Sequence, residues 1–216
     1  MENRIIFAGP TLRDIPSESL KKLNSLYLLR EPVRRGDIDA LVQTGMPGEI
    51  VLVDGMFFDV PAVGHKEIMN ALRAGWKVQG LSSMGAIRAA EMQRYGMIGF
   101  GRVFEMFAAD PAFRDDEVTL LHHAAPSYEP ISEPLVHLRL MLNHMLEESI
   151  ISDRQHTDVL TTLENIWFGY RTLENLSKLL VQYGVDYGSD ASDLRVNIKN
   201  FRIKSEDLTK FVNLIN

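Results

Sequence analysis

Short apolar runs and amphipathic segments alternate along the first half of the chain. Apolar runs ended by turn residues, typical of buried strands, occur at residues 4–8, 26–29, 49–53 and 76–81. Between them, residues 37–44 and 64–74 carry apolar side chains at helical spacing. This order of strands and helices predicts an α/β fold with a largely parallel sheet and flanking helices.

Helical periodicity dominates the second half. Residues 115–121 indicate an acidic turn followed by one more strand. From Glu133 onward, leucines recur at helical spacing, which predicts an amphipathic helix. Further helices are expected at 157–168, at 172–183 and in a last segment capped by Ser205, with a turn-rich linker at 185–193.

This change of pattern suggests a division of the chain. We expect an α/β core over residues 1–150 and a helical C-terminal extension over residues 151–216 that packs on the core.

Composition narrows the classes of function. The net charge of −6 argues against binding to nucleic acid or to an anionic membrane surface. There is no apolar stretch of about 18 residues, and the first residues do not resemble a signal peptide. The lack of cysteine excludes disulfides and thiolate catalysis and suits a cytoplasmic location.

The most informative stretch is residues 76–91, where the apolar strand gives way to the sequence Ser-Ser-Met-Gly-Ala-Ile-Arg-Ala-Ala-Glu. Ser82 and Ser83 occupy the predicted turn, and a helix begins at Met84 or Gly85. Free amides at a helix N-terminus favour negative charge beside a hydroxyl. We therefore predict a serine nucleophile, with the amides of Met84 and Gly85 as oxyanion donors. The Gly-x-Ser-x-Gly pattern is split between the two serines, so either could attack.

Lys66 is the best candidate for the group that activates the serine. It follows the loop after the strand at residues 49–53, so it should reach the same edge of the sheet as the serines. An amine in the first turn of a helix, partly buried, is disfavoured as a cation and could accept a hydroxyl proton. The alternative is a solvated surface lysine beside a helix-capping serine.

Other chemistries have weaker support. His122, or its neighbour His123, could form a Ser–His pair, and His122 is also a candidate for substrate binding. A metal site of His, Asp and Glu ranks behind these. The glycines of residues 96–101 have the wrong order for a dinucleotide fingerprint, and no phosphate loop occurs. We therefore expect no cofactor and no metal.

Five blocks of sequence, in order, resemble the TfuA-like core domain. They lie at residues 7–12, 32–37, 54–63 with 65–67, 82–91 and 115–118. The resemblance implies a protein that assists a YcaO-type enzyme in replacing a peptide-backbone oxygen by sulfur. It further implies hydrolysis of a thiocarboxylated, ThiS-like carrier to release sulfide, and help for YcaO in engaging its precursor peptide. Gly64 stands where the resemblance leads us to expect a bulkier residue.

The resemblance also implies a Ser–Lys pair, which falls on Ser82 or Ser83 and on Lys66. Arg35 or Arg88 could hold the thiocarboxylate or the carrier tail, although each could instead form a structural ion pair, Arg88 with Glu91 three residues later. The alternatives are a non-catalytic scaffold and an unrelated hydrolase of small thioesters or esters. The oligomeric state stays open, and a homo-oligomer is compatible with the sequence.

Overall fold

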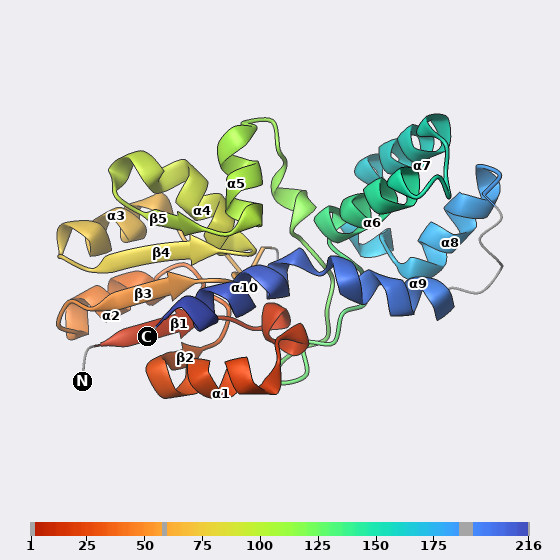
Figure 1. Cartoon of the computed structure of the whole chain (residues 1–216). Coiled ribbons are helices and arrows are strands. Elements are labelled where there is room, and N and C mark those ends of the chain that lie inside the picture. The colour runs from red at the N-terminus through yellow and green to blue at the C-terminus, as the bar shows by residue number, and fades with distance from the viewer. Residues whose placement is uncertain (1–2, 58–59, 186–191, 216) are drawn as a thin grey trace. The chain divides into compact units, whose positions relative to one another are not determined.

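The structure, a computed structural model, describes residues 3–57, 60–185 and 192–215 (Figure 1). The chain forms two compact units, which we describe separately. The first comprises residues 1–113 together with residues 203–216, and the second comprises residues 114–202. The boundary expected at residue 150 falls inside the second unit. The division into a core of residues 1–150 and a helical extension of residues 151–216 stays a prediction.

A five-stranded parallel sheet forms the centre of the first unit. Its strands lie in the order β2-β1-β3-β4-β5, and each pairs with its neighbours in parallel. Their bounds are β1 (Arg4–Phe7), β2 (Leu28–Arg30), β3 (Glu49–Leu52), β4 (Lys77–Leu81) and β5 (Ile98–Phe100). Because all strands are parallel, their carboxyl ends meet at one edge, where α/β proteins usually bind ligands. The predicted fold class is confirmed.

Helices surround this sheet. Their bounds are α1 (Ser17–Leu26), α2 (Asp37–Thr44), α3 (His65–Arg73), α4 (Met84–Met92), α5 (Arg102–Ala109) and α10 (Ile203–Leu214), with short 3-10 helices η1 (Pro10–Asp14) and η2 (Gln93–Tyr95).

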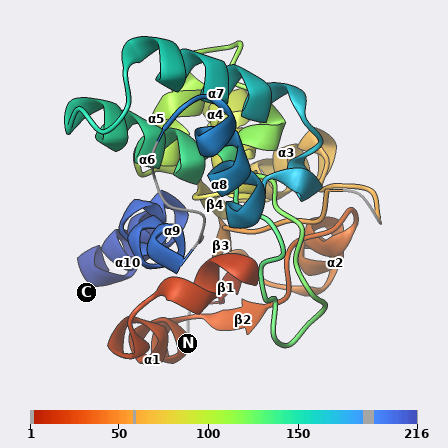
Figure 2. The ribbon, with the colours of Figure 1, turned by 90° about the vertical axis from the view of Figure 1, so that its right-hand side faces the viewer.

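Alternation along each strand separates two layers of core. Ile5 and Phe7 pack with residues of α2, α3 and α4 on one face. Ile6 and Val51 pack on the other face with residues of α1 and α10. Figure 2 shows the strands between these two groups of helices. The C-terminal helix α10 is therefore part of the sheet's own core.

One local expectation was wrong, and one strand was not predicted. Residues 115–121 contain the 3-10 helix η3 (Asp115–Glu117) and irregular chain rather than a strand. The fifth strand, β5, lies instead in the glycine-containing segment 96–101. Gly99 fits there because a Cβ would come within 2.1 Å of the Phe104 ring.

The second unit is helical, as expected. Its elements are η3, α6 (Leu135–Glu147), α7 (Asp153–Asn165), η4 (Phe168–Tyr170), α8 (Leu173–Gln182), α9 (Ser192–Asn197) and η5 (Ile198–Phe201). The leucine face predicted after Glu133 is buried: Leu138 and Leu142 pack with Val159 and Leu176. Residues 186–191 of the expected linker lie outside the described residues.

A buried arginine organises one end of the second unit. Arg171 is 0% exposed and donates to the carboxylate of Asp116 at 2.7 Å, to the backbone oxygen of Asp116 at 2.8 Å and to that of Leu163 at 2.9 Å. Nearby, Arg139 pairs with Glu117. Burial raises the pKa of Glu117, although its bond to Arg139 acts in the opposite direction.

Candidate functional site

The turn between β4 and α4 is built by close backbone approach. A Cβ on Gly80, in β4, would lie 2.0 Å from the backbone oxygen of Gly85. A Cβ on Gly85, in the first turn of α4, would lie 1.8 Å from the backbone oxygen of Leu52 in β3. Glycine at both positions therefore lets α4 begin directly against the carboxyl ends of β3 and β4.

Ser82 lies at the centre of this turn in a strained conformation. Its φ of 65° is in the left-handed region that residues with a side chain seldom adopt. The residue is 0% exposed, and its hydroxyl donates a hydrogen bond of 2.8 Å to the backbone oxygen of Lys204 in α10. A strained serine between a strand and a helix is the local geometry of a nucleophile elbow. The Ser82 hydroxyl, however, is already engaged.

Ser83 immediately precedes α4 and is 2% exposed. Its hydroxyl has no hydrogen-bond partner among the described residues. Of the two predicted oxyanion donors, the amide of Gly85 already donates to the backbone oxygen of Val53 at 3.2 Å. The amide of Met84 has no such partner within the described part of the chain. Within the described residues, the arrangement therefore leaves one serine hydroxyl and one amide without a hydrogen-bond partner at this turn.

Lys66 lies elsewhere on the first unit. It is exposed, and it lines a pocket of about 480 Å³ together with Glu91, Met92 and Tyr95. Its neighbour His65 contacts Glu91 at 2.7 Å. Glu91 follows Ser83 by two helical turns, about 12 Å along the helix axis. The structure thus does not bring Lys66 to either serine, and the Ser–Lys66 pair stays a prediction.

The two arginines differ in their engagement. Arg88 pairs with Glu91 at 2.7 Å and donates to the backbone oxygen of Val63 at 3.0 Å, so it forms the structural ion pair that was the alternative to substrate binding. Arg35 is exposed and donates to the backbone oxygen of Ala62 at 3.1 Å. A Cβ on Gly64 would lie 3.7 Å from Arg35, an ordinary contact, so a larger residue would fit there.

His122 belongs to the second unit. Its Nδ1 lies 2.7 Å from the backbone oxygen of His123, and its ring packs edge-on against Tyr128 with 5.6 Å between centroids. These contacts hold the ring within its own loop. A substrate-binding role for His122 stays a prediction.

Sequence analysis missed what α10 contributes to the carboxyl edge. The hydroxyl of Ser205 donates to the backbone oxygen of Thr11 at 2.9 Å. Asp207 accepts from the amides of Arg102 and Val103 at 3.0 and 2.9 Å and so caps α5. Ser205 lies inside α10, so the expected cap was wrong: the helix begins two residues earlier. The sequence around Ser205 indicates the start of a helix, but it does not indicate which residues that helix contacts.

Asp54, two residues after the end of β3, stabilises the same edge. Its carboxylate accepts bonds from the amides of Gly9 and Thr11 at 2.8 and 3.0 Å and from the Thr11 hydroxyl at 2.7 Å. These three bonds satisfy a carboxylate that is 3% exposed. Its role is therefore to hold the start of η1, while Phe58 and Asp59 of the same loop lie outside the described residues.

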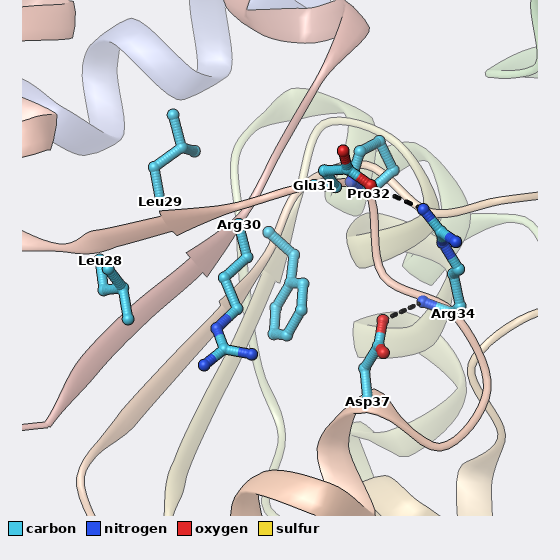
Figure 3. Close-up of a pocket in the computed structure, with 8 residues that line it drawn as sticks. Leu28, Leu29, Arg30, Glu31, Pro32, Arg34 and Asp37 are labelled. Atoms are coloured by element: carbon cyan, nitrogen blue, oxygen red, sulfur yellow. Dashed lines mark hydrogen bonds and ion pairs between the residues drawn. The ribbon is translucent and has the colours of Figure 1, made fainter. Parts of the chain in front are cut away.

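A second pocket, of about 530 Å³, lies where β1 and β2 end (Figure 3). Phe7, Arg30 and Arg34 are among the residues that line it. The Arg34 guanidinium pairs with Glu31 at 2.7 Å, and the backbone N–H of Arg34 donates a hydrogen bond of 2.8 Å to the Asp37 carboxylate. Two cationic side chains, Arg30 and Arg34, and two acidic ones, Glu31 and Asp37, line the pocket. The pocket therefore has little net charge with which to select a ligand.

The described residues contain no cluster of three or more His, Cys, Asp or Glu side chains suited to a metal ion. No helix among them has the length and apolar character needed to cross a membrane.

Fold and site together define an α/β protein with a strained serine turn at the carboxyl edge of a parallel sheet. A sequence profile of the family described as TfuA-like protein matches residues 54–172, more than half of the chain. The chain therefore belongs to the TfuA-like family. No curated protein matches it.

Proposed function

We propose that this protein is the accessory hydrolase of a YcaO-type enzyme in peptide-backbone thioamidation, and that it releases sulfide from a thiocarboxylated, ThiS-like carrier in the cytoplasm. Membership of the TfuA-like family over residues 54–172 is the observation that carries the proposal. The strained turn at Ser82, which places Ser83 at the start of α4, adds a chemical basis for it.

The proposed reaction is an acyl transfer to Ser83. Its hydroxyl loses a proton to a lysine amine, and the oxygen bonds to the carbonyl carbon of the thiocarboxylate. The Met84 amide stabilises the oxyanion, a contribution of about 10²–10³ in rate for one donor. The carbon–sulfur bond then breaks, sulfide leaves, and water hydrolyses the acyl-serine to restore the hydroxyl.

Two further parts of the proposal concern the base and the carrier. The family resemblance indicates Lys66 as the base, which would require the start of α3 to approach Ser83. Arg35, exposed on the loop before α2, is the better proposed contact for the carrier's negative tail, because Arg88 is already paired with Glu91.

A scaffold is the second candidate function. The observations that favour it are the 2% exposure of Ser83 and the exposed position of Lys66 in the pocket beside Glu91. In that case the protein joins YcaO, carrier and precursor peptide without chemistry of its own.

Free sulfide separates the two functions. A mixture of YcaO, ATP, precursor peptide and thiocarboxylated carrier should form thioamide only when this protein is added. If the protein is a hydrolase, free sulfide should restore thioamide formation in its absence. If sulfide fails to replace the protein, while Ser83→Ala supports the full reaction, the scaffold function is correct.

A further inference from the structure

Lys204 is a buried amine at the edge of the sheet where the serines lie. It is the second residue of α10 and is 2% exposed. Lysine is rarely buried to this extent without a specific use for its charge or its amine. The residue lies outside the segment 54–172 that the family profile matches.

Two hydrogen bonds fix the first turn of α10 beside the serine turn. The backbone oxygen of Lys204 accepts from the Ser82 hydroxyl at 2.8 Å. One residue later, the Ser205 hydroxyl donates to the backbone oxygen of Thr11 at 2.9 Å. The first bond links α10 to the end of β4, and the second links it to η1, which follows β1. Lys204 is therefore anchored next to the residue that precedes Ser83.

The face of α10 that carries Lys204 indicates where its side chain goes. Leu208, four residues later on the same face, is 0% exposed and packs with Leu81 and Val53 of the sheet core. Side chains on a helix lean toward its N-terminus. Since α10 begins at the carboxyl edge (Figure 1), its first turn, which carries Lys204, lies nearer that edge than Leu208 does.

We propose that Lys204 is the amine that activates Ser83, an assignment that rests on the proposed hydrolase function. Withdrawal from water and a place in the first turn of a helix both disfavour the cationic form of an amine. Neutral Lys204 accepts the hydroxyl proton as the Ser83 oxygen bonds to the acyl carbon. The resulting ammonium returns this proton to the sulfur as the carbon–sulfur bond breaks. In the second half, a proton from water passes through Lys204 to Ser83 as the acyl–oxygen bond breaks.

The site would then combine residues from both ends of the first unit. The family segment supplies the nucleophile and the oxyanion donor, and the C-terminal helix supplies the base. Lys66, the base that the family resemblance indicates, is the competing assignment. Lys210, exposed on the same helix as Lys204 and paired with Glu206, serves as the matched control lysine.

Labelling by a fluorophosphonate tests the assignment without any carrier protein. This probe phosphonylates activated serines, and mass spectrometry locates the labelled residue. We expect labelling of Ser83 in the wild type and in Lys210→Met at similar rates. In Lys204→Met the rate should fall at least about 100-fold, the usual contribution of a general base.

Lys204→Gln guards against a folding defect, because it keeps a neutral, polar side chain of similar reach that does not take up a proton at neutral pH. It should melt near the wild-type temperature and label as slowly as Lys204→Met. Labelling of both Lys204 variants at the wild-type rate would overturn the assignment, as would loss of labelling in Lys66→Met alone or an unlabelled wild-type Ser83. If Ser83 is labelled in this Lys204-dependent way but no sulfide is released from the carrier, the serine–lysine assignment stands and the proposed substrate is wrong.

Discussion

The hydroxyl of Ser82 donates a hydrogen bond of 2.8 Å to the backbone oxygen of Lys204, a residue 122 positions later in the chain. The bond joins a residue with φ of 65° to the first turn of the C-terminal helix. Conformations of this kind cost about 1–3 kcal/mol and persist only where their surroundings fix them. Here α10 supplies part of that support.

Replacement of Ser82 by alanine should therefore destabilise the protein. The substitution removes the hydrogen bond to the backbone oxygen of Lys204, a loss of about 0.5–1.5 kcal/mol. Ser83→Ala is the matched control, since the Ser83 hydroxyl has no partner among the described residues and its loss should cost under about 1 kcal/mol. Urea unfolding measures both values. Equal stabilities for the two variants would show that the bond to α10 contributes little.

Glycine at position 85 should be indispensable to the fold. A Cβ would lie 1.8 Å from the backbone oxygen of Leu52, so Gly85→Ala must push α4 away from β3 and should cost at least about 2–3 kcal/mol. Gly64→Ala offers a comparison, because its Cβ would meet atoms no closer than 3.7 Å at an ordinary φ of −96°. Thermal melting should show a large drop for Gly85→Ala and almost none for Gly64→Ala. A well-folded Gly85→Ala with an unchanged melting temperature would contradict this packing.

Glu49 should make stability depend on pH. Burial acts to raise its pKa, but bonds from Lys77, Arg4 and Tyr27 outweigh burial and hold the pKa below the usual 4.5. A lowered folded-state pKa means that the stabilisation is present above pH 4.5 and is lost as the pH falls through the folded-state value. Glu49→Gln should therefore be less stable than the wild type at pH 7, with a smaller deficit at pH 3.5. Urea unfolding at the two pH values checks this, and a deficit that is constant or grows on acidification would refute it.

Arg171 should be essential to the second unit. Its replacement by leucine leaves the carboxylate and backbone oxygen of Asp116 without their buried partner, which typically costs about 3–5 kcal/mol. Arg154→Ala is the control, since that side chain is 92% exposed and its contact with Asp158 is 3.7 Å long. Hydrogen exchange of the α7 and α8 amides should accelerate strongly for Arg171→Leu and hardly for Arg154→Ala. Similar protection in both variants would rule out this role.

Elements with a strong local pattern were predictable from the sequence. The apolar runs of β1, β3 and β4 and the helical spacing of α3 and α6 each reflect burial of one or both faces. Strand β5 was missed because it has only three residues, one of them glycine, and so short a segment shows no recognisable alternation of apolar and polar positions.

The candidate site was predictable only in part. The serine turn is local, since the glycines that allow it lie within a few residues of Ser82 in the sequence. The position of Lys66 depends on the loop before α3. In that loop the backbone oxygen of Val63 accepts a hydrogen bond from Arg88, so α3 begins beside the later turns of α4 rather than beside its first turn. The return of α10 to the carboxyl edge is a long-range contact, and no local pattern around Lys204 could reveal it.

Sulfide release from a thiocarboxylated, ThiS-like carrier tests the central claim most directly. The rate should be measured with purified wild type and with Ser83→Ala, after melting curves have shown that both are folded. The account predicts release by the wild type and a loss of at least about 10³-fold in Ser83→Ala, as expected for removal of a nucleophile. Equal rates for the two proteins, or no release by the wild type, would contradict it.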